Sequence, residues 1–133
     1  GKIFLVYSAA GTDALYCLGM CTADENADLL DPASWTKSEH PVFQSSRKNR
    51  QFGPGHNNFT KHEEGHDVMV YHARQEERYL VDEGYQPLYD AGRNATLMRI
   101  YWNEDGTPNF SVPIPSGKGH DIPTEFTAKV IVK

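Results

Sequence analysis

The chain is a series of short apolar runs separated by polar turns. The runs at 3–6 and 97–102 are apolar at nearly every position, which is typical of strands covered on both faces. The chain shows no long amphipathic stretch that would indicate a helix. This pattern predicts an all-β array of small stacked sheets such as a propeller, with strands at 3–9, 16–22, 36–43, 57–60, 68–74, 95–102, 109–112 and 126–132.

One short segment, 28–35, carries the signal of a helix start. Asp31 stands before Pro32, and Asp is a favoured N-cap while Pro is favoured at the first helical position. We therefore expect one or two helical turns here, as a connector between strands.

The chain also contains an internal repeat. Residues 2–9 align with residues 66–73, 64 positions later. Because a second match keeps the same order at nearly the same offset, the two together indicate two copies of one supersecondary unit. The second match places Trp35, Pro41 and Phe43 on Trp102, Pro108 and Phe110.

Composition narrows the possible partners. The chain has 133 residues, of which 38% are hydrophobic, enough for one modest core. A net charge of −5 without a run of Lys or Arg argues against nucleic acid, which is bound mainly through cationic contacts. We expect neither a nucleic-acid nor a membrane partner, and a neutral or cationic ligand fits better.

Two cysteines bear on the compartment. Cys17 and Cys21 lie in one predicted strand, where four residues span about 13 Å, beyond the reach of a disulfide. We expect them to remain unpaired. Unpaired thiols slightly favour a cytoplasmic location, and a secreted protein with inert buried thiols is the alternative.

The segment 52–59 holds the most informative local signal. Gly53 and Gly55 permit a positive φ or a close approach of the backbone, and Pro54 fixes its own φ. This spacing predicts a tight turn that directs the imidazole of His56. A surface histidine on an ordinary loop is the alternative interpretation.

Several segments together resemble glycoside hydrolase family 43, most closely its arabinofuranosidase and arabinan-degrading branch. The resemblance implies a five-bladed β-propeller with an active-site funnel on its axis. The chain would then be about two C-terminal blades of a longer protein, with about 1–50 as one blade and about 51–133 as the last blade and a C-terminal closing segment. The matching segments are 3–9, 29–37, 52–57, 71–74, 93–95 and 101–108.

In that family, an aspartate base, a glutamate acid and a second aspartate perform inverting hydrolysis. The resemblance implies that the acid lies in a Glu-Gly-Pro segment just upstream of the strand matching 3–9. This sequence contains no Glu-Gly-Pro, and Glu83 precedes Gly84 without the proline and at another place. We expect no catalytic residue in this chain, and no activity of the chain alone.

The resemblance also implies roles for residues of this chain that bind substrate or metal rather than transfer protons. Arg93 matches an arginine that reaches into the sugar pocket, where its fork of donors suits vicinal hydroxyls. His56 matches a histidine that faces the axial cavity and takes part in a metal site, usually calcium, completed largely by water. We expect Arg93, His56 and Phe52 to bind substrate, and His56 to bind a structural calcium ion, although imidazole is a poor ligand for hard cations.

Two other sets of residues have alternative interpretations. His62, His66 and His72 could suggest a metal-dependent hydrolase, but the first two straddle a turn and the third lies far along a strand. Trp35, Tyr101 and Trp102 could form a sugar-stacking platform, but their repeat-equivalent positions favour packing between blades.

The leading hypothesis is a part of an inverting α-L-arabinofuranosidase that acts on plant cell-wall saccharides containing arabinose or xylose. The alternative is a non-catalytic carbohydrate-binding or self-assembling β fragment, because unpaired strand edges are templates for association. The partners would be these saccharides together with upstream propeller blades or other copies of the chain.

Overall fold

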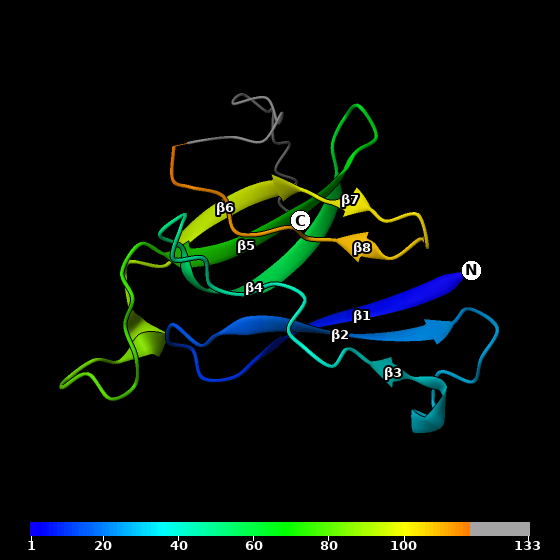
Figure 1. Cartoon of the computed structure of the whole chain (residues 1–133), viewed down its shortest axis with the longest axis horizontal. Helices are drawn as coiled ribbons and strands as arrows, with labels where there is room; N and C mark the ends of the chain where they lie inside the picture. The colour runs from blue at the N-terminus through cyan, green and yellow to red at the C-terminus, as the bar shows by residue number, and fades with distance from the viewer. Residues whose placement is uncertain (118–133) are drawn as a thin grey trace, which may run out of the picture.

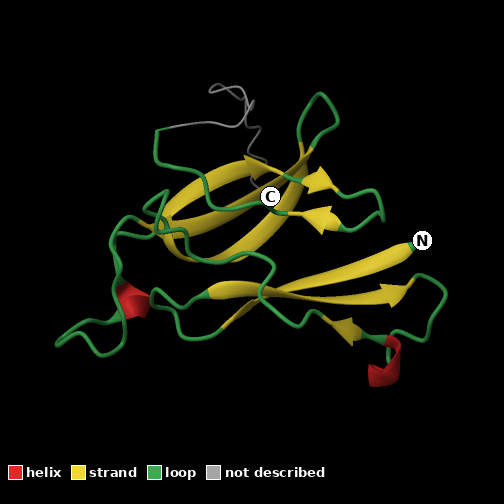
Figure 2. Ribbon diagram, in the orientation of Figure 1, coloured by secondary structure: helices red, strands yellow, loops and turns green. Residues whose placement is uncertain are grey.

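Two three-stranded antiparallel sheets and a short hairpin make up the computed structural model, which describes residues 1–117 (Figures 1 and 2). The first sheet has the order β1-β2-β3 and the second the order β4-β5-β6, while β7 pairs with β8. The predicted all-β fold is confirmed. The strands are β1 (Lys2–Ala9), β2 (Cys17–Asp24), β3 (Thr36–Lys37), β4 (Phe52–Lys61), β5 (Asp67–Arg74), β6 (Asn94–Arg99), β7 (Tyr101–Trp102) and β8 (Pro108–Asn109).

The predicted strands differ in how well they match. Those at 3–9 and 68–74 agree with β1 and β5 to within one residue. The strand predicted at 36–43 is only the two-residue β3 followed by a single bridge between Phe43 and Leu18. The polar residues and Pro41 between these pairings explain the interruption. The strand predicted at 126–132 lies outside the described residues.

The predicted strand at 95–102 is wrong in its continuity, because the chain breaks it at Ile100. β5 begins at Asp67, and its register pairs Val68 with Arg99, so the ladder of β6 ends there. The amide of Ile100 still donates to the Asp67 carbonyl at 2.8 Å. The next two residues then form β7 in a separate hairpin.

The predicted helical turn is confirmed as a 3₁₀ helix, η1 (Pro32–Ser34). The Asp31 carboxylate accepts a hydrogen bond from the Ala33 amide at 2.9 Å, as an N-cap does. A second 3₁₀ helix, η2 (Pro87–Tyr89), lies in the long connection from β5 to β6. Within residues 1–117, no helix has the length and apolarity that crossing a membrane requires.

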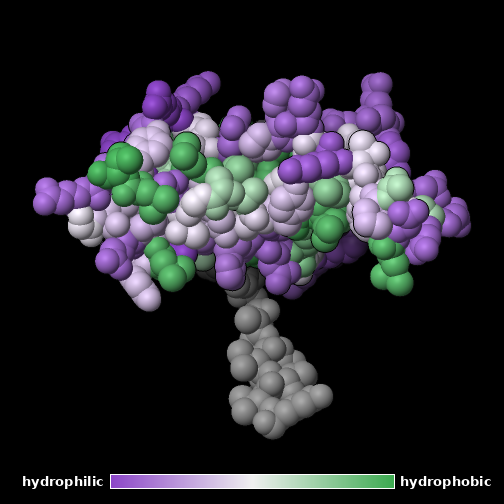
Figure 3. Space-filling model, turned by 90° about the horizontal axis from the view of Figure 1, so that it is seen from below, coloured by the Kyte–Doolittle hydropathy of each residue, from purple (hydrophilic) through white to green (hydrophobic). Residues whose placement is uncertain are grey.

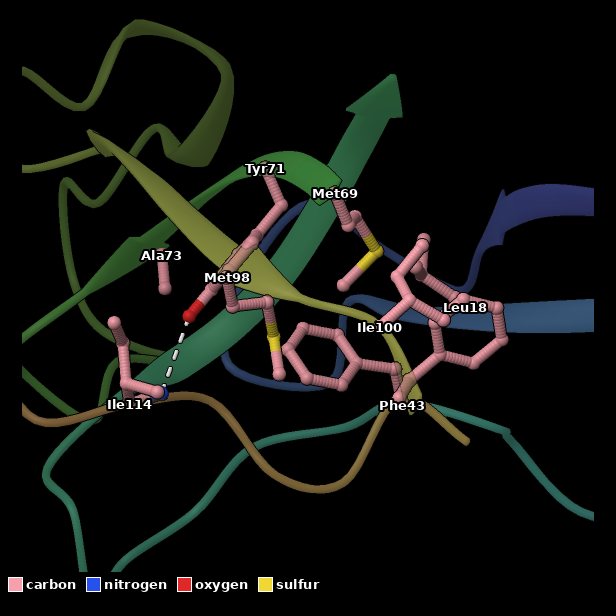
Figure 4. Close-up of a cluster of buried hydrophobic side chains, with 9 residues drawn as sticks. Leu18, Phe43, Met69, Tyr71, Ala73, Met98, Ile100 and Ile114 are labelled. Atoms are coloured by element: carbon pink, nitrogen blue, oxygen red, sulfur yellow. Dashed lines mark hydrogen bonds between the residues drawn. The ribbon is translucent and has the colours of Figure 1, made fainter. Parts of the chain in front are cut away.

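The hydrophobic core lies between the two sheets and is closed by the segment that follows β8 (Figure 4). The rings of Phe43 and Tyr71 meet edge to face, with centroids 4.9 Å apart. The Ile114 amide donates to the Tyr71 hydroxyl, and burial raises the pKa of Tyr71 to about 12. The core side chains are Leu18, Phe43, Met69, Tyr71, Ala73, Met98, Ile100, Phe110 and Ile114.

The two repeat-equivalent strands, β1 and β5, have different environments. β5 lies in the middle of its sheet and is mostly buried. β1 is an edge strand, paired on one side with β2 among the described residues, and it has no fully buried position. The expectation of cover on both faces at 3–6 and 97–102 is therefore met only in part, because Met98 and Ile100 are buried whereas Leu5 is 52% and Trp102 53% exposed.

The loops 10–16 and 75–93 gather at one end of the two sheets, on the left in Figure 1. The amide of Ala14 donates to the Arg78 carbonyl at 2.7 Å, so the loops are in direct contact. Cys17, at the start of β2, and Cys21 are both free, as their spacing predicts. Burial raises the pKa of the Cys17 thiol.

Candidate functional site

His56 lies within β4 rather than at the end of a tight turn, so the predicted turn at 52–59 is wrong. The conformational freedom of the glycines is used instead inside the strand, where Gly53 has a φ of 58°. The register of β4 against β5 shifts twice, between Phe52 and Gly55 and between Gly55 and Asn58. Such bulges bend a strand and re-aim its side chains.

The backbone at His56 is itself unusual, with a φ of 54°. This left-handed conformation is uncommon for a residue with a side chain and is found at functional sites more often than elsewhere. The His56 amide donates to the Ser8 hydroxyl at 2.8 Å, which ties β4 to the end of β1. The imidazole is exposed.

Three rings lie side by side next to this bulge. The rings of Tyr16 and His72 are stacked with centroids 5.8 Å apart, and the ring of His56 lies 6.2 Å from that of His72. Tyr16 can approach because Gly55 has no side chain, since a Cβ there would lie 2.1 Å from Tyr16 Cε1. A residue of loop 10–16 thus reaches the bulged strand of the second sheet.

His72 is the most perturbed group in this cluster. Burial lowers its pKa from 6.5 to about 4, and the positive charges of Arg93 and Arg74 and the proximity of His56 add to the effect. The ring is therefore neutral at the pH where an exposed histidine takes up a proton. Its Nε2 atom is buried and has no hydrogen-bond partner among residues 1–117, which marks it as a place for a water or a ligand group.

Arg93 precedes β6 at the same end of the sheets. One of its guanidinium nitrogens donates to the Leu88 carbonyl, so the 3₁₀ helix η2 holds the side chain. Its charge is close enough to His72 to act on the pKa of that ring. His56, His72 and Arg93 therefore belong to one cluster, while their contact with substrate stays a prediction.

Phe52, the third predicted substrate-binding residue, has a different environment. Its side chain is 6% exposed, and it pairs with Arg74 where β4 begins. Burial argues against a contact with substrate and favours a packing role for this side chain.

A buried arginine that the sequence did not single out holds the loops of the cluster together. The Arg74 side chain is 1% exposed and donates from Nε to the Asp90 carboxylate at 2.8 Å. It also donates to the carbonyls of Thr12, Asp13 and Pro87. Arg74 therefore ties both loops at this end to β5.

Asp13, also buried, completes this network of hydrogen bonds. Its carboxylate accepts from the amide of Leu15 at 2.8 Å and from that of Leu80 at 3.0 Å, so it joins loop 10–16 to loop 75–93. No local sequence pattern indicated this contact. A glycine at position 53 with a positive φ leaves the space that the Asp13 carbonyl and the Arg74 guanidinium occupy.

The described residues do not by themselves fit a calcium ion at His56. The ring has His72 beside it, while the nearby Ser8 hydroxyl accepts from the His56 amide. Over residues 1–117, no three His, Cys, Asp or Glu side chains are grouped so as to hold a metal. Because calcium takes six to eight oxygen ligands, a calcium ion at His56 stays a prediction.

Of the alternative residues, His72 belongs to this cluster, whereas His62, His66 and Trp102 make other contacts. The rings of His62 and His66 stack 6.2 Å apart across the turn between β4 and β5. Trp102 lies 6.1 Å from the ring of Phe4 in β1 and donates to the Asp67 carboxylate. This contact between the hairpin and the first sheet agrees with a packing role for Trp102.

Solved structures show which class of fold the two sheets form. The chain matches the α-L-arabinofuranosidase from Lactobacillus brevis with a TM-score of 0.81 and 51% identity, over 89% of this chain and 35% of that one. A xylan β-1,4-xylosidase from Bacillus halodurans has the same fold at 16% identity, with a TM-score of 0.64. The two sheets are thus part of a β-propeller like those of these glycoside hydrolases.

The chain belongs to glycosyl hydrolases family 43, whose family model matches residues 1–108. It is 52% identical over 118 residues to an extracellular exo-α-(1→5)-L-arabinofuranosidase of Streptomyces avermitilis. It is also 52% identical over 118 residues to α-L-arabinofuranosidase B of Pyricularia oryzae. Both alignments cover 88% of this chain, which spans about 24% of the length of either relative.

Proposed function

We propose that the chain is part of an inverting α-L-arabinofuranosidase that acts on arabinan or arabinoxylan. The observation that carries this proposal is the 52% identity to arabinofuranosidases over 88% of the chain. The extracellular relative supports the secreted alternative over the cytoplasmic location that the free cysteines slightly favour.

In this proposal the described residues bind and orient the sugar, while carboxylates outside the chain transfer the protons. Arg93 donates hydrogen bonds to hydroxyls of the arabinofuranosyl unit. The neutral His72 supports His56 through their neighbouring rings, and its free Nε2 pairs with a sugar hydroxyl or a water. Aromatic rings and a guanidinium group as hydrogen-bond donor suit an uncharged substrate.

The alternative, a self-assembling fragment, is favoured by one observation. Among the described residues, β1 is an edge strand and several apolar side chains, including Leu5, are exposed. On the face seen in Figure 3, hydrophobic patches are separated by hydrophilic residues. Exposed strand edges and apolar patches favour association. In the leading proposal, other parts of the propeller cover these surfaces.

A graft tests the proposed function. The aligned segment of the Streptomyces avermitilis arabinofuranosidase is replaced by the matching part of this chain, giving a variant called the graft below. We expect the graft to release arabinose from an aryl α-L-arabinofuranoside. We expect this chain alone to release none above a buffer blank, because in this proposal the carboxylates that transfer the protons lie outside the chain. A folded but inactive graft would contradict the proposal.

Within the graft, Arg93→Met tests the substrate contact. We expect kcat/KM for the aryl arabinofuranoside to fall by about 10- to 100-fold, because charged hydrogen bonds to the sugar are lost. Arg99→Met is the matched control, since Arg99 lies over the Tyr101 ring at 5.2 Å and not at the cluster. Equal losses in the two variants would remove Arg93 from the substrate site.

A further inference from the structure

The hydroxyl of Ser8 and the ring of His72 approach the same residue, His56, from the two sheets. Ser8 lies near the end of β1, and its hydroxyl accepts a hydrogen bond from the His56 amide at 2.8 Å. His72 lies in β5, and its ring centroid is 6.2 Å from that of His56. In the internal repeat, where residues 2–9 align with residues 66–73, Ser8 and His72 are equivalent positions. The two copies of the repeat therefore carry different side chains at this position, and both lie next to His56.

The hydrogen bond to Ser8 lies where β4 lacks regular pairing. The register of β4 against β5 passes from Gly55 to Asn58 and skips His56. In a bulge, the extra residue is left without a partner in the ladder. His56 also has a φ of 54°, in the left-handed region, which a residue with a side chain keeps only where its surroundings enforce it. The Ser8 hydroxyl supplies such a constraint from outside the strand.

The other neighbours of the bulge are rings, and they act on side chains. The Tyr16 ring occupies the space that a side chain at Gly55 would fill, and it stacks on His72. Ser8 differs from them because it binds the backbone that carries the imidazole of His56. Without the hydroxyl, the His56 amide would need another acceptor, and the imidazole would be free to turn.

We propose that Ser8 is a positioning residue: its hydroxyl holds the backbone of His56 in the left-handed conformation that directs the imidazole toward the substrate. Ser8 itself does not touch the sugar and transfers no proton, so its effect on hydrolysis passes through His56. This inference rests on the proposed function, in which His56 and Arg93 lie at the arabinofuranosyl unit.

In the graft, Ser8→Ala removes the acceptor. We expect kcat/KM for the aryl α-L-arabinofuranoside to fall by about tenfold, because the imidazole loses its fixed direction. Ser8→Thr keeps a hydroxyl, and a strand accepts a β-branched residue, so we expect this variant to retain activity within about twofold.

Ser38→Ala is the matched control for the loss of a serine hydroxyl. Ser38 is half-buried, as Ser8 is, and its hydroxyl also accepts from a strand amide, that of Met20 at 3.3 Å. This bond lies on the β3 side of β2, so β2 separates it from β1 and from His56. We expect Ser38→Ala to leave kcat/KM unchanged, and a loss equal to that of Ser8→Ala would contradict the positioning role.

A second background separates positioning from a purely structural role. His56→Ala requires the same left-handed backbone but lacks the imidazole, so in this background Ser8→Ala has no ring to misplace. We expect Ser8→Ala to change kcat/KM there by less than about twofold, whereas a structural role would give the tenfold loss in both backgrounds. Equal losses in the two backgrounds, or full activity of Ser8→Ala alone, would overturn the proposal.

Failure of the proposed function gives a different result. If the graft is folded but hydrolyses no arabinofuranoside, the proposed function fails. Crystal structures of the graft and its Ser8→Ala variant then still test the positioning role, which requires the φ of His56 or the distance between the rings of His56 and His72 to change. A His56 with the same φ and the same ring position in both structures would overturn it.

Discussion

Replacing Arg74 by Met in the graft is expected to lower the free energy of unfolding by about 3 to 5 kcal/mol. The side chain is 1% exposed, and its loss takes the donor from the Thr12 carbonyl. It also removes one of the donors to the carbonyls of Asp13 and Pro87 and to the Asp90 carboxylate. Leaving a buried polar group without a hydrogen-bond partner destabilises the folded state by more than the hydrogen bond itself stabilises it. Urea unfolding followed by circular dichroism measures the change.

The matched control is Arg47→Met. Arg47 also pairs with a carboxylate, that of Glu77, but its side chain is 78% exposed. Ion pairs in water contribute little to stability, so we expect almost no change in the unfolding midpoint. Similar losses in the two variants would mean that Arg74 is not a buried tie between the loops.

Local sequence patterns predicted the strands where pairing and burial agree with them. β5 is apolar because it lies in the middle of its sheet over the core, and its bounds were predicted to within one residue. The repeat-equivalent β1 has a similar sequence but is an edge strand among the described residues. The apolar pattern of a strand shows which side chains it could bury. The strands and segments packed against it determine which of them are buried.

The candidate site was predicted only in part, because its geometry depends on contacts distant in sequence. The glycines and His56 indicated an unusual backbone, but turn and bulge share the same signal, and pairing with β5 selects the bulge. The buried contacts of Asp13 and Arg74 join residues about sixty positions apart. No local pattern contains that information, whereas the resemblance of 93–95 to the family did indicate Arg93.

The second large effect is expected for Gly53→Ala in the graft, which should lose about 2 to 4 kcal/mol of unfolding free energy. An added Cβ would lie 2.2 Å from the Asp13 carbonyl oxygen and 2.6 Å from Arg74 Nη1, and φ is 58°. The first neighbour is backbone, so relief requires loop 10–16 to move away from β4.

Gly65→Ala separates this clash from the cost of the left-handed backbone. Gly65 has a φ of 86° at the turn between β4 and β5, and a Cβ there would meet no atom within 4 Å. We expect a loss of only about 1 kcal/mol, from backbone strain alone.

Because moving loop 10–16 also disturbs Tyr16 beside His72, Gly53→Ala should reduce kcat/KM for the aryl arabinofuranoside, whereas Gly65→Ala should not. Equal losses of stability with unchanged activity in both variants would show that loop 10–16 does not pack against β4 as described.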